Sequence, residues 1–166
     1  SAGYSSAKAS TDFSPRRTDM NYWTQSETNI FVAAHRGFSG EYPENTMLAF
    51  EKAVEIGVDG IELDVHLTKD KRIVVHHNFD IWDPDTDKVF MLRDLTYDEV
   101  AKINVNCRED FKEKYGFVKS PLLDEVYELL APTGLTVNVE IKSDEEELPA
   151  MCIELARKYG MQDRVY

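Results

Sequence analysis

The sequence predicts an α/β protein in which short apolar strands alternate with helices. The first observation is that each of four short apolar stretches, at 30–36, 60–66, 73–77 and 135–142, ends in ionisable residues. The second is that segments with helical periodicity follow most of these stretches. Ionisable groups collected at strand ends are typical of parallel strands whose carboxyl ends converge on one site.

The number of strands indicates half of a barrel. A (β/α)8 barrel needs about 250 residues, whereas this chain has 166 residues, four predicted strands and the start of a fifth at 164–166. We therefore expect a fold of the (β/α)8 TIM-barrel type, of which the chain covers about the N-terminal half. Residues 1–28 have no apolar period and are expected to form a flexible tail before one domain at 29–166.

The first strand, expected at 30–34, is followed by the clearest helix signal. Apolar residues recur at helical spacing over 45–56, and Gly57 then supplies a C-terminal stop. Asn45 or Thr46 is suited to cap the N-terminus of this helix, whose exposed N–H groups would favour an anion. An ordinary helix start explains these residues adequately as well.

The middle of the chain contains two short strands and a long acidic segment. Residues 61–66 alternate strictly between apolar and polar side chains, and residues 73–77 form a second apolar run. For 78–95 we expect an acidic loop, with a turn at the Asp-Pro-Asp sequence of 83–85.

The C-terminal part again alternates between helix and strand. The pattern predicts helices at 96–103 and 121–130, a strand at 137–141 and a long helix at 144–159. Gly160 ends the last helix.

Carboxylates on two of the strands are candidate metal ligands. Glu62 and Asp64 are two residues apart and share one strand face with His66, while Glu140 lies on the strand at 137–141. Oxygen ligands on a rigid face suit Mg²⁺ or Ca²⁺. Taken alone, each motif is also consistent with an ordinary half-exposed strand or a surface salt bridge.

Cationic side chains lie at the ends of the same strands. Arg36 follows His35 directly, and Lys142 shares a face with Glu140. Arg36 offers a forked donor to phosphate, Lys142 offers a point charge, and Gly37 permits a tight turn of the backbone. A histidine at this position is suited to proton transfer, although a hydrogen-bonded histidine at a strand end is the commoner case.

The neighbours His76 and His77 point to opposite faces of a strand, so only one of them can face the site. The link between 66 and 73 is too short for a parallel crossover and predicts a hairpin with a tight turn near 69–71. With a two-residue turn, His77 lies on the face of Glu62 and Asp64, and a three-residue turn would reverse that choice.

Taken together, these motifs resemble the glycerophosphodiester phosphodiesterase family. The corresponding segments lie at 35–70, 74–78, 120–126 and 137–142, and the resemblance covers residues 30–166. It implies a (β/α)8 barrel that uses one divalent cation, Mg²⁺ or Ca²⁺, to hydrolyse glycerophosphodiesters to glycerol 3-phosphate and an alcohol.

The resemblance also implies roles for eight side chains. The acid–base pair corresponds to His35 and His77. The metal carboxylates correspond to Glu62, Asp64 and Glu140. The cations that contact the substrate phosphate correspond to Arg36 and Lys142, and a supporting glutamate that lines the site corresponds to Glu44. The segment at 78–119 corresponds to a small insertion that helps to enclose the substrate.

The chain departs from the family pattern after the second histidine. Asn78 stands where the family usually has Asp, and residues 79–83 replace a stretch similar to Arg-Thr-Thr-Asn-Gly. These changes concern the shape of the insertion and the choice of alcohol. The later strands, which close the barrel and bind the glycerol moiety in the family, are absent from these 166 residues.

The net charge of −12 argues against nucleic acid or an anionic membrane as a partner, and no apolar run approaches the ~20 residues of a membrane span. Ser1 in place of Met leaves the compartment open between the cytoplasm and export. The alternatives to the phosphodiesterase are a non-catalytic half-barrel that needs a partner chain, and a relative that acts as a lysophospholipase D or cleaves phosphoinositides. An oligomer or a missing C-terminal half follows from the open barrel.

Overall fold

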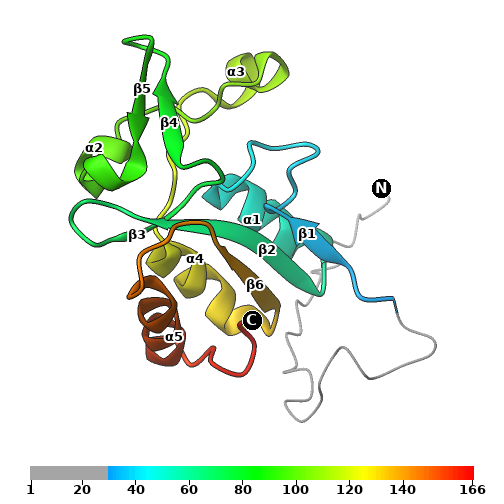
Figure 1. Cartoon of the computed structure of the whole chain (residues 1–166). Helices are drawn as coiled ribbons and strands as arrows, with labels where there is room; N and C mark the ends of the chain where they lie inside the picture. The colour runs from blue at the N-terminus through cyan, green and yellow to red at the C-terminus, as the bar shows by residue number, and fades with distance from the viewer. Residues whose placement is uncertain (1–29) are drawn as a thin grey trace, which may run out of the picture.

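The structure, a computed structural model, describes residues 30–166 (Figure 1). The predicted tail at 1–28 lies outside the described residues. Within the described part, no helix has the length and apolar character needed to cross a membrane.

A mixed four-stranded sheet forms the centre of the fold. Its middle strand is β2 (Gly60–Leu67), which pairs in parallel with β1 (Ala33–His35) and with β6 (Thr136–Ile141). Near its C-terminal end, β2 also pairs antiparallel with β3 (Ile73–Val75). Three parallel strands therefore end at the same edge of the sheet, as the sequence pattern predicts.

Three helices pack against the sheet and enclose its main core. They are α1 (Met47–Ile56), α4 (Leu123–Leu130) and α5 (Leu148–Lys158), and Figure 1 shows α4 and α5 next to each other below β2. Fully buried apolar side chains from these helices pack with those of β2 and β6. Burial of this apolar layer is the main stabilising term of the fold.

Helix α1 begins and ends at sequence signals. The Oγ1 atom of Thr46 accepts a hydrogen bond from the backbone N–H of Ala49 at 3.3 Å, so Thr46 is the N-cap. Gly57 adopts the left-handed conformation with φ 78°, and its N–H group donates to carbonyls of the last turn. The C-terminal stop expected at Gly57 is confirmed.

The connection between β2 and β3 is longer than both the two-residue turn and the three-residue turn considered from the sequence. It comprises residues 68–72, because Leu67 pairs with Ile73, and the Thr68 hydroxyl bonds to the backbone of Arg72. Because the number of loop residues is odd, the register is the one expected for a three-residue turn. The N–H group of His76, not of His77, donates to the carbonyl of Asp64 at 3.0 Å.

The segment at 78–95, expected to be an acidic loop, is instead an antiparallel hairpin followed by a short helical turn. The strands are β4 (Asp80–Asp83) and β5 (Lys88–Met91), and η2 (Leu92–Asp94) follows. Asp83 stabilises the predicted turn by accepting hydrogen bonds from the backbone of Asp85 and the hydroxyl of Thr86. Apolar side chains of this segment are buried in a second hydrophobic core. The acidic composition of the segment gives no indication of this core.

Two short helices complete the segment between β5 and α4. They are α2 (Tyr97–Val100), within the predicted helix at 96–103, and α3 (Glu109–Tyr115), which the sequence analysis does not predict. In Figure 1 the hairpin and α3 extend away from the sheet, on the side opposite α4 and α5.

The expected start of a further strand at 164–166 is present beside β6. Val165 forms a parallel bridge with Val137, and the N–H group of Tyr166 donates to the carbonyl of Val137 at 2.9 Å. The spatial order is thus β1, β2, β6 and then the strand start, which is the sequential order of a (β/α)8 barrel.

We predict that Gly37→Ala lowers the free energy of unfolding by roughly 2–4 kcal/mol, because it adds both backbone strain and overpacking. Gly37 has φ 79°, and a Cβ atom there would lie 2.8 Å from backbone and side-chain atoms of Ala49 in α1. Urea denaturation of the two proteins measures the difference. Gly40→Ala is the matched control because a Cβ atom at Gly40 meets nothing within 4 Å; equal losses at both positions would contradict the prediction.

Candidate active site

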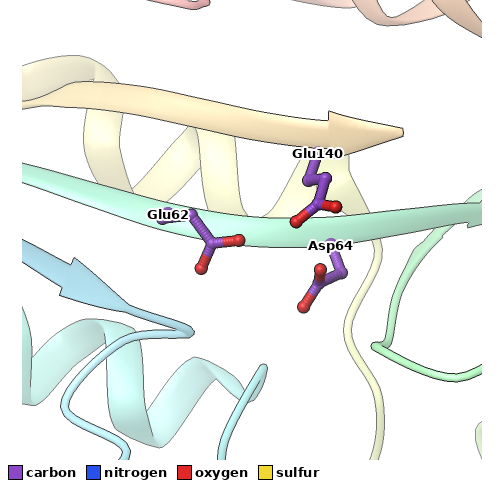
Figure 2. Close-up of side chains that lie close together, drawn as sticks. All are labelled: Glu62, Asp64 and Glu140. Atoms are coloured by element: carbon purple, nitrogen blue, oxygen red, sulfur yellow. The ribbon is translucent and has the colours of Figure 1, made fainter. Parts of the chain in front are cut away.

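Carboxylates from β2 and β6 form a cluster at the edge where the parallel strands end (Figure 2). One oxygen atom from each of Glu62, Asp64 and Glu140 lies within 4.8 Å of the others. The sheet register explains this, because Asp64 pairs directly with Glu140 and lies two residues from Glu62. The three residues predicted as metal ligands are therefore brought together.

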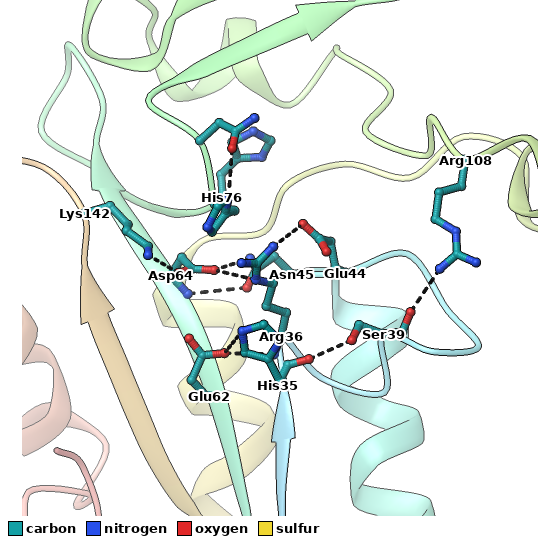
Figure 3. Close-up of polar contacts among 12 residues, drawn as sticks. His35, Arg36, Ser39, Glu44, Asn45, Glu62, Asp64, His76, Arg108 and Lys142 are labelled. Atoms are coloured by element: carbon teal, nitrogen blue, oxygen red, sulfur yellow. Dashed lines mark hydrogen bonds and ion pairs between the residues drawn. The ribbon is translucent and has the colours of Figure 1, made fainter.

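Asp64 is the most buried member of the cluster and is surrounded by donors (Figure 3). Its Oδ2 atom lies 3.3 Å from Nε of Arg36, and its Oδ1 atom lies 3.3 Å from Nζ of Lys142. These contacts place both predicted phosphate-binding cations at the carboxylate cluster.

The cluster has the chemistry of a site for Mg²⁺ or Ca²⁺. Three carboxylate oxygens supply the hard ligands that these ions prefer. The Oδ1 atom of Asp64 is buried and has no hydrogen-bond partner among the described residues, although Lys142 lies nearby. A buried carboxylate oxygen without a hydrogen bond is costly unless a cation is its partner. The three carboxylates therefore fit a divalent cation.

Glu62 joins the cluster to the end of β1. Its Oε2 atom accepts a hydrogen bond from the backbone N–H of Arg36 at 3.0 Å and lies 3.7 Å from Nε2 of His35. Burial raises the pKa of the Glu62 carboxyl, and the Arg36 hydrogen bond opposes that effect. The His35 side chain is 68% exposed, so a substrate can reach it.

Arg36 connects Glu44 to the cluster. Its backbone is in the left-handed region with φ 57°, and its guanidinium group lies 2.9 Å from Oε1 of Glu44 as well as near Asp64. Similarly, the Nζ atom of Lys142 lies 2.5 Å from Oε1 of Glu140. Both cations are thus held at the site by carboxylates, and Glu44 reaches the site through Arg36.

The histidines after β3 lie in different environments. The Nδ1 atom of His76 lies 3.1 Å from Oγ of Ser120, and burial lowers the pKa of this ring to about 4. His77 is half-buried, and its Nδ1 atom lies 2.8 Å from Oδ1 of Asn78. The Nε2–H group of buried His66 donates to the carbonyl of His77, and burial lowers the pKa of His66.

Asn45 holds Asp64 in place, a role that the sequence analysis does not predict. Its Nδ2 atom donates to Oδ2 of Asp64 at 2.8 Å, and its Oδ1 atom accepts from the backbone N–H of Asp64 at 3.4 Å. The Asn45 backbone has φ 54°, and its N–H group donates to the carbonyl of Arg36. The only indication of this role in the sequence is the residue type, because asparagine tolerates the left-handed backbone conformation.

The sequence profile of the Glycerophosphoryl diester phosphodiesterase family matches residues 35–163. A glycerophosphodiester phosphodiesterase from Caldanaerobacter subterraneus subsp. tengcongensis is 40% identical over 137 residues, which cover 81% of this chain and 55% of that protein. The chain thus spans about half the length of the curated relatives that it resembles.

Solved structures agree with this similarity. The crystal structure of a glycerophosphodiester phosphodiesterase from Agrobacterium tumefaciens aligns with a TM-score of 0.68 and 28% identity, over 80% of this chain and 55% of that one. A phosphodiesterase from Oleispira antarctica, in complex with the product sn-glycerol-3-phosphate, aligns with a TM-score of 0.66 and 28% identity, over 76% and 51% of the two chains. The described fold is therefore the N-terminal half of a TIM barrel of this type.

We predict that Asn45→Ala lowers the free energy of unfolding by roughly 2–4 kcal/mol, because a charged hydrogen bond is lost and a left-handed backbone is strained. Asn45→Gly should cost less, since glycine adopts this φ without strain. Urea denaturation measures both. If the Gly variant is as unstable as the Ala variant, the backbone conformation of Asn45 contributes nothing.

Proposed function

Because the chain belongs to the glycerophosphoryl diester phosphodiesterase family, we propose that its protein hydrolyses glycerophosphodiesters to glycerol 3-phosphate and an alcohol in a metal-dependent reaction. The observation that carries the proposal is the cluster of Glu62, Asp64 and Glu140, with Arg36 and Lys142 in contact with it. The site thus combines a place for a divalent cation with two further cations that suit a phosphate.

Glu62, Asp64 and Glu140 would hold one divalent cation, Mg²⁺ or Ca²⁺. When bound, such an ion neutralises the phosphate and stabilises negative charge that develops on its oxygens during displacement. In this proposal Asn45 fixes the Oδ2 side of the Asp64 carboxylate, so that the Oδ1 atom stays free of hydrogen bonds and faces the ion.

Arg36 and Lys142 would bind the phosphate oxygens of the substrate. Both side chains lie within 3.3 Å of the Asp64 carboxylate, so the phosphate would enter between cations that are already held in position. The fork of Arg36 suits two oxygens at once, and Lys142 contributes a point charge. Glu44 supports the orientation of Arg36 through its 2.9 Å contact.

His35 and His77 would transfer the protons. One ring takes a proton from the nucleophile, while the other protonates the leaving alkoxide. His35 is exposed beside Glu62, and the contact between Nδ1 of His77 and Asn78 leaves Nε2 of that ring to meet a substrate. His76 suits the role poorly, because a ring with a pKa of about 4 is a weak base near neutral pH.

We predict that the protein binds Mg²⁺ or Ca²⁺ and that Glu62→Gln abolishes this binding, because the variant removes one anionic ligand from the cluster. Isothermal titration calorimetry measures the affinity without any substrate. Glu51→Gln, at an exposed position on α1, is the matched control and should bind as the unaltered protein does. Equal affinity in the Glu62 variant would remove the cluster from the mechanism.

We predict that His35→Ala or His77→Ala in the whole protein lowers the turnover of glycerophosphodiesters by a factor on the order of 10² or more, as expected for a lost general acid or base. His76→Asn should act mainly on stability, because it disturbs a buried contact with Ser120. Turnover assays combined with urea denaturation separate the two effects. An essential His76 beside a dispensable His77 would reverse the assignment.

We expect the remaining strands of the barrel to pair beyond Val165, from the same polypeptide or from a partner chain. The bridge between Val165 and Val137 marks where the next strand joins β6. Residues 1–166 on their own should then form an oligomer or aggregate, because parallel strands are normally covered on both faces. A compact monomer with full activity, measured by sedimentation and product analysis, would contradict this. Product analysis also separates the lysophospholipase D and phosphoinositide alternatives.

A further inference from the structure

Helix α3 contacts the turn that follows β1, although the two segments are far apart in the sequence. This turn, at 36–45, joins β1 to α1 and carries Arg36 and Glu44, and it begins directly after His35. The helix and the turn meet at contacts between residues 69 and 74 positions apart. No residue of α3 has a role in the proposed hydrolysis, so these contacts need an explanation of their own.

Contacts from α3 and the residue before it hold the tip of this turn. The Nη1 atom of Arg108 donates to the carbonyl of Ser39 at 3.3 Å (Figure 3). The hydroxyl of Tyr115 donates to the carbonyl of Glu41 at 2.8 Å. The ring of Tyr115 also packs against that of Tyr42, with centroids 5.3 Å apart. Both hydrogen bonds end on backbone carbonyls, so they fix the path of the chain in the turn.

The tip of the turn is connected to His35. The Oγ atom of Ser39 donates to the carbonyl of His35 at 2.8 Å, so that Arg108, Ser39 and His35 form one chain of hydrogen bonds (Figure 3). The His35 side chain is 68% exposed, and the position of its ring therefore depends largely on the backbone. A group that transfers protons has to be held to within about 0.5 Å of its productive position.

The segment that contains α3 is built as a closed unit. The buried Nδ2 group of Asn106 donates to the carbonyls of Phe111 at 3.0 Å and Gly116 at 2.9 Å. Where the segment begins and ends, the N–H group of Val105 donates to the carbonyl of Val118 at 2.9 Å. These bonds tie the helix to its own ends, so that α3 can restrain the turn that it contacts.

We propose that α3 braces the turn after β1 and that Tyr115 and Arg108 are positioning residues for His35. The assignment rests on the proposed phosphodiesterase function. Both residues act through the backbone of the turn and not on the substrate. Loss of either bond should let the His35 ring sample more positions, which lowers the fraction of bound substrate that meets it in a productive geometry.

The first test uses Tyr115→Phe in the whole protein, because this variant removes the hydroxyl and keeps the ring beside Tyr42. We expect kcat for a glycerophosphodiester to fall about 3- to 10-fold, the effect of one hydrogen bond, with KM changed less than about twofold. In the His35→Ala background the same substitution should lower kcat no further, because the ring that it positions is absent.

Tyr159→Phe is the matched control. Tyr159 lies at the C-terminal end of α5, is half-buried and has a hydroxyl contact with Asp124, so the variant removes the same group away from the brace. It should leave kcat and KM unchanged. An unchanged kcat in Tyr115→Phe, or an equal fall in the presence and absence of His35, would overturn the proposal.

A second test does not depend on turnover. The Hε1 resonance of His35, identified by its absence from the NMR spectrum of His35→Ala, should shift or broaden in Tyr115→Phe and in Arg108→Gln but not in Tyr159→Phe. A resonance that stays unchanged in the first two variants would refute the brace. If the unaltered protein hydrolyses no glycerophosphodiester but the resonance responds as expected, the proposed hydrolysis fails while the brace stands.

Discussion

The parallel pairing of β2 with β6 is the constraint on which the site depends. Its register sets Asp64 opposite Glu140, and the period of two along β2 adds Glu62 to the same face. A shift of one residue would turn all of β6 over and bury Glu140 against the helices. Leu63 and Val137 prevent that shift, because both are fully buried in the core beneath α1, α4 and α5. The apolar face of the sheet therefore fixes the position of the charged face.

Carboxylates held this close repel one another, and the chain contains its own compensation. Arg36 lies near Oδ2 of Asp64 and Lys142 lies near Oδ1, and Asn45 forms two hydrogen bonds with the same residue. Two of these residues, Arg36 and Asn45, adopt left-handed backbone conformations that cost about 1–2 kcal/mol each. Such strain is found where the surrounding structure enforces it, commonly at functional sites. The strained turn after β1 therefore contributes to holding the Asp64 carboxylate in position.

The parts of the fold that follow from periodicity could be predicted from the sequence, and those that depend on loop length or tertiary packing could not. The strict alternation in 61–66 predicted that Glu62 and Asp64 share one strand face, and Gly57 predicted the C-terminal end of α1 correctly. The loop at 68–72 has an odd number of residues and is held by the Thr68 hydroxyl, a contact that no propensity encodes. The sequence therefore left open whether His76 or His77 shares a strand face with Asp64. The role of Asn45 depends on a partner 19 residues away, so its local context suggested only a helix cap.

The hairpin β4–β5 was missed because its composition is acidic while its stability comes from a few buried side chains. Ile81 and Leu92 are almost fully buried against Val74 and Val100, so the hairpin has a small core of its own. That core joins the end of β3, which in turn pairs with the end of β2 just beyond Asp64. The hairpin is therefore fixed relative to the carboxylate cluster by packing and not by a flexible link. Sequence changes in this hairpin can alter the surface near the carboxylate cluster while the register of β2 and β6, and with it the cluster itself, stays the same.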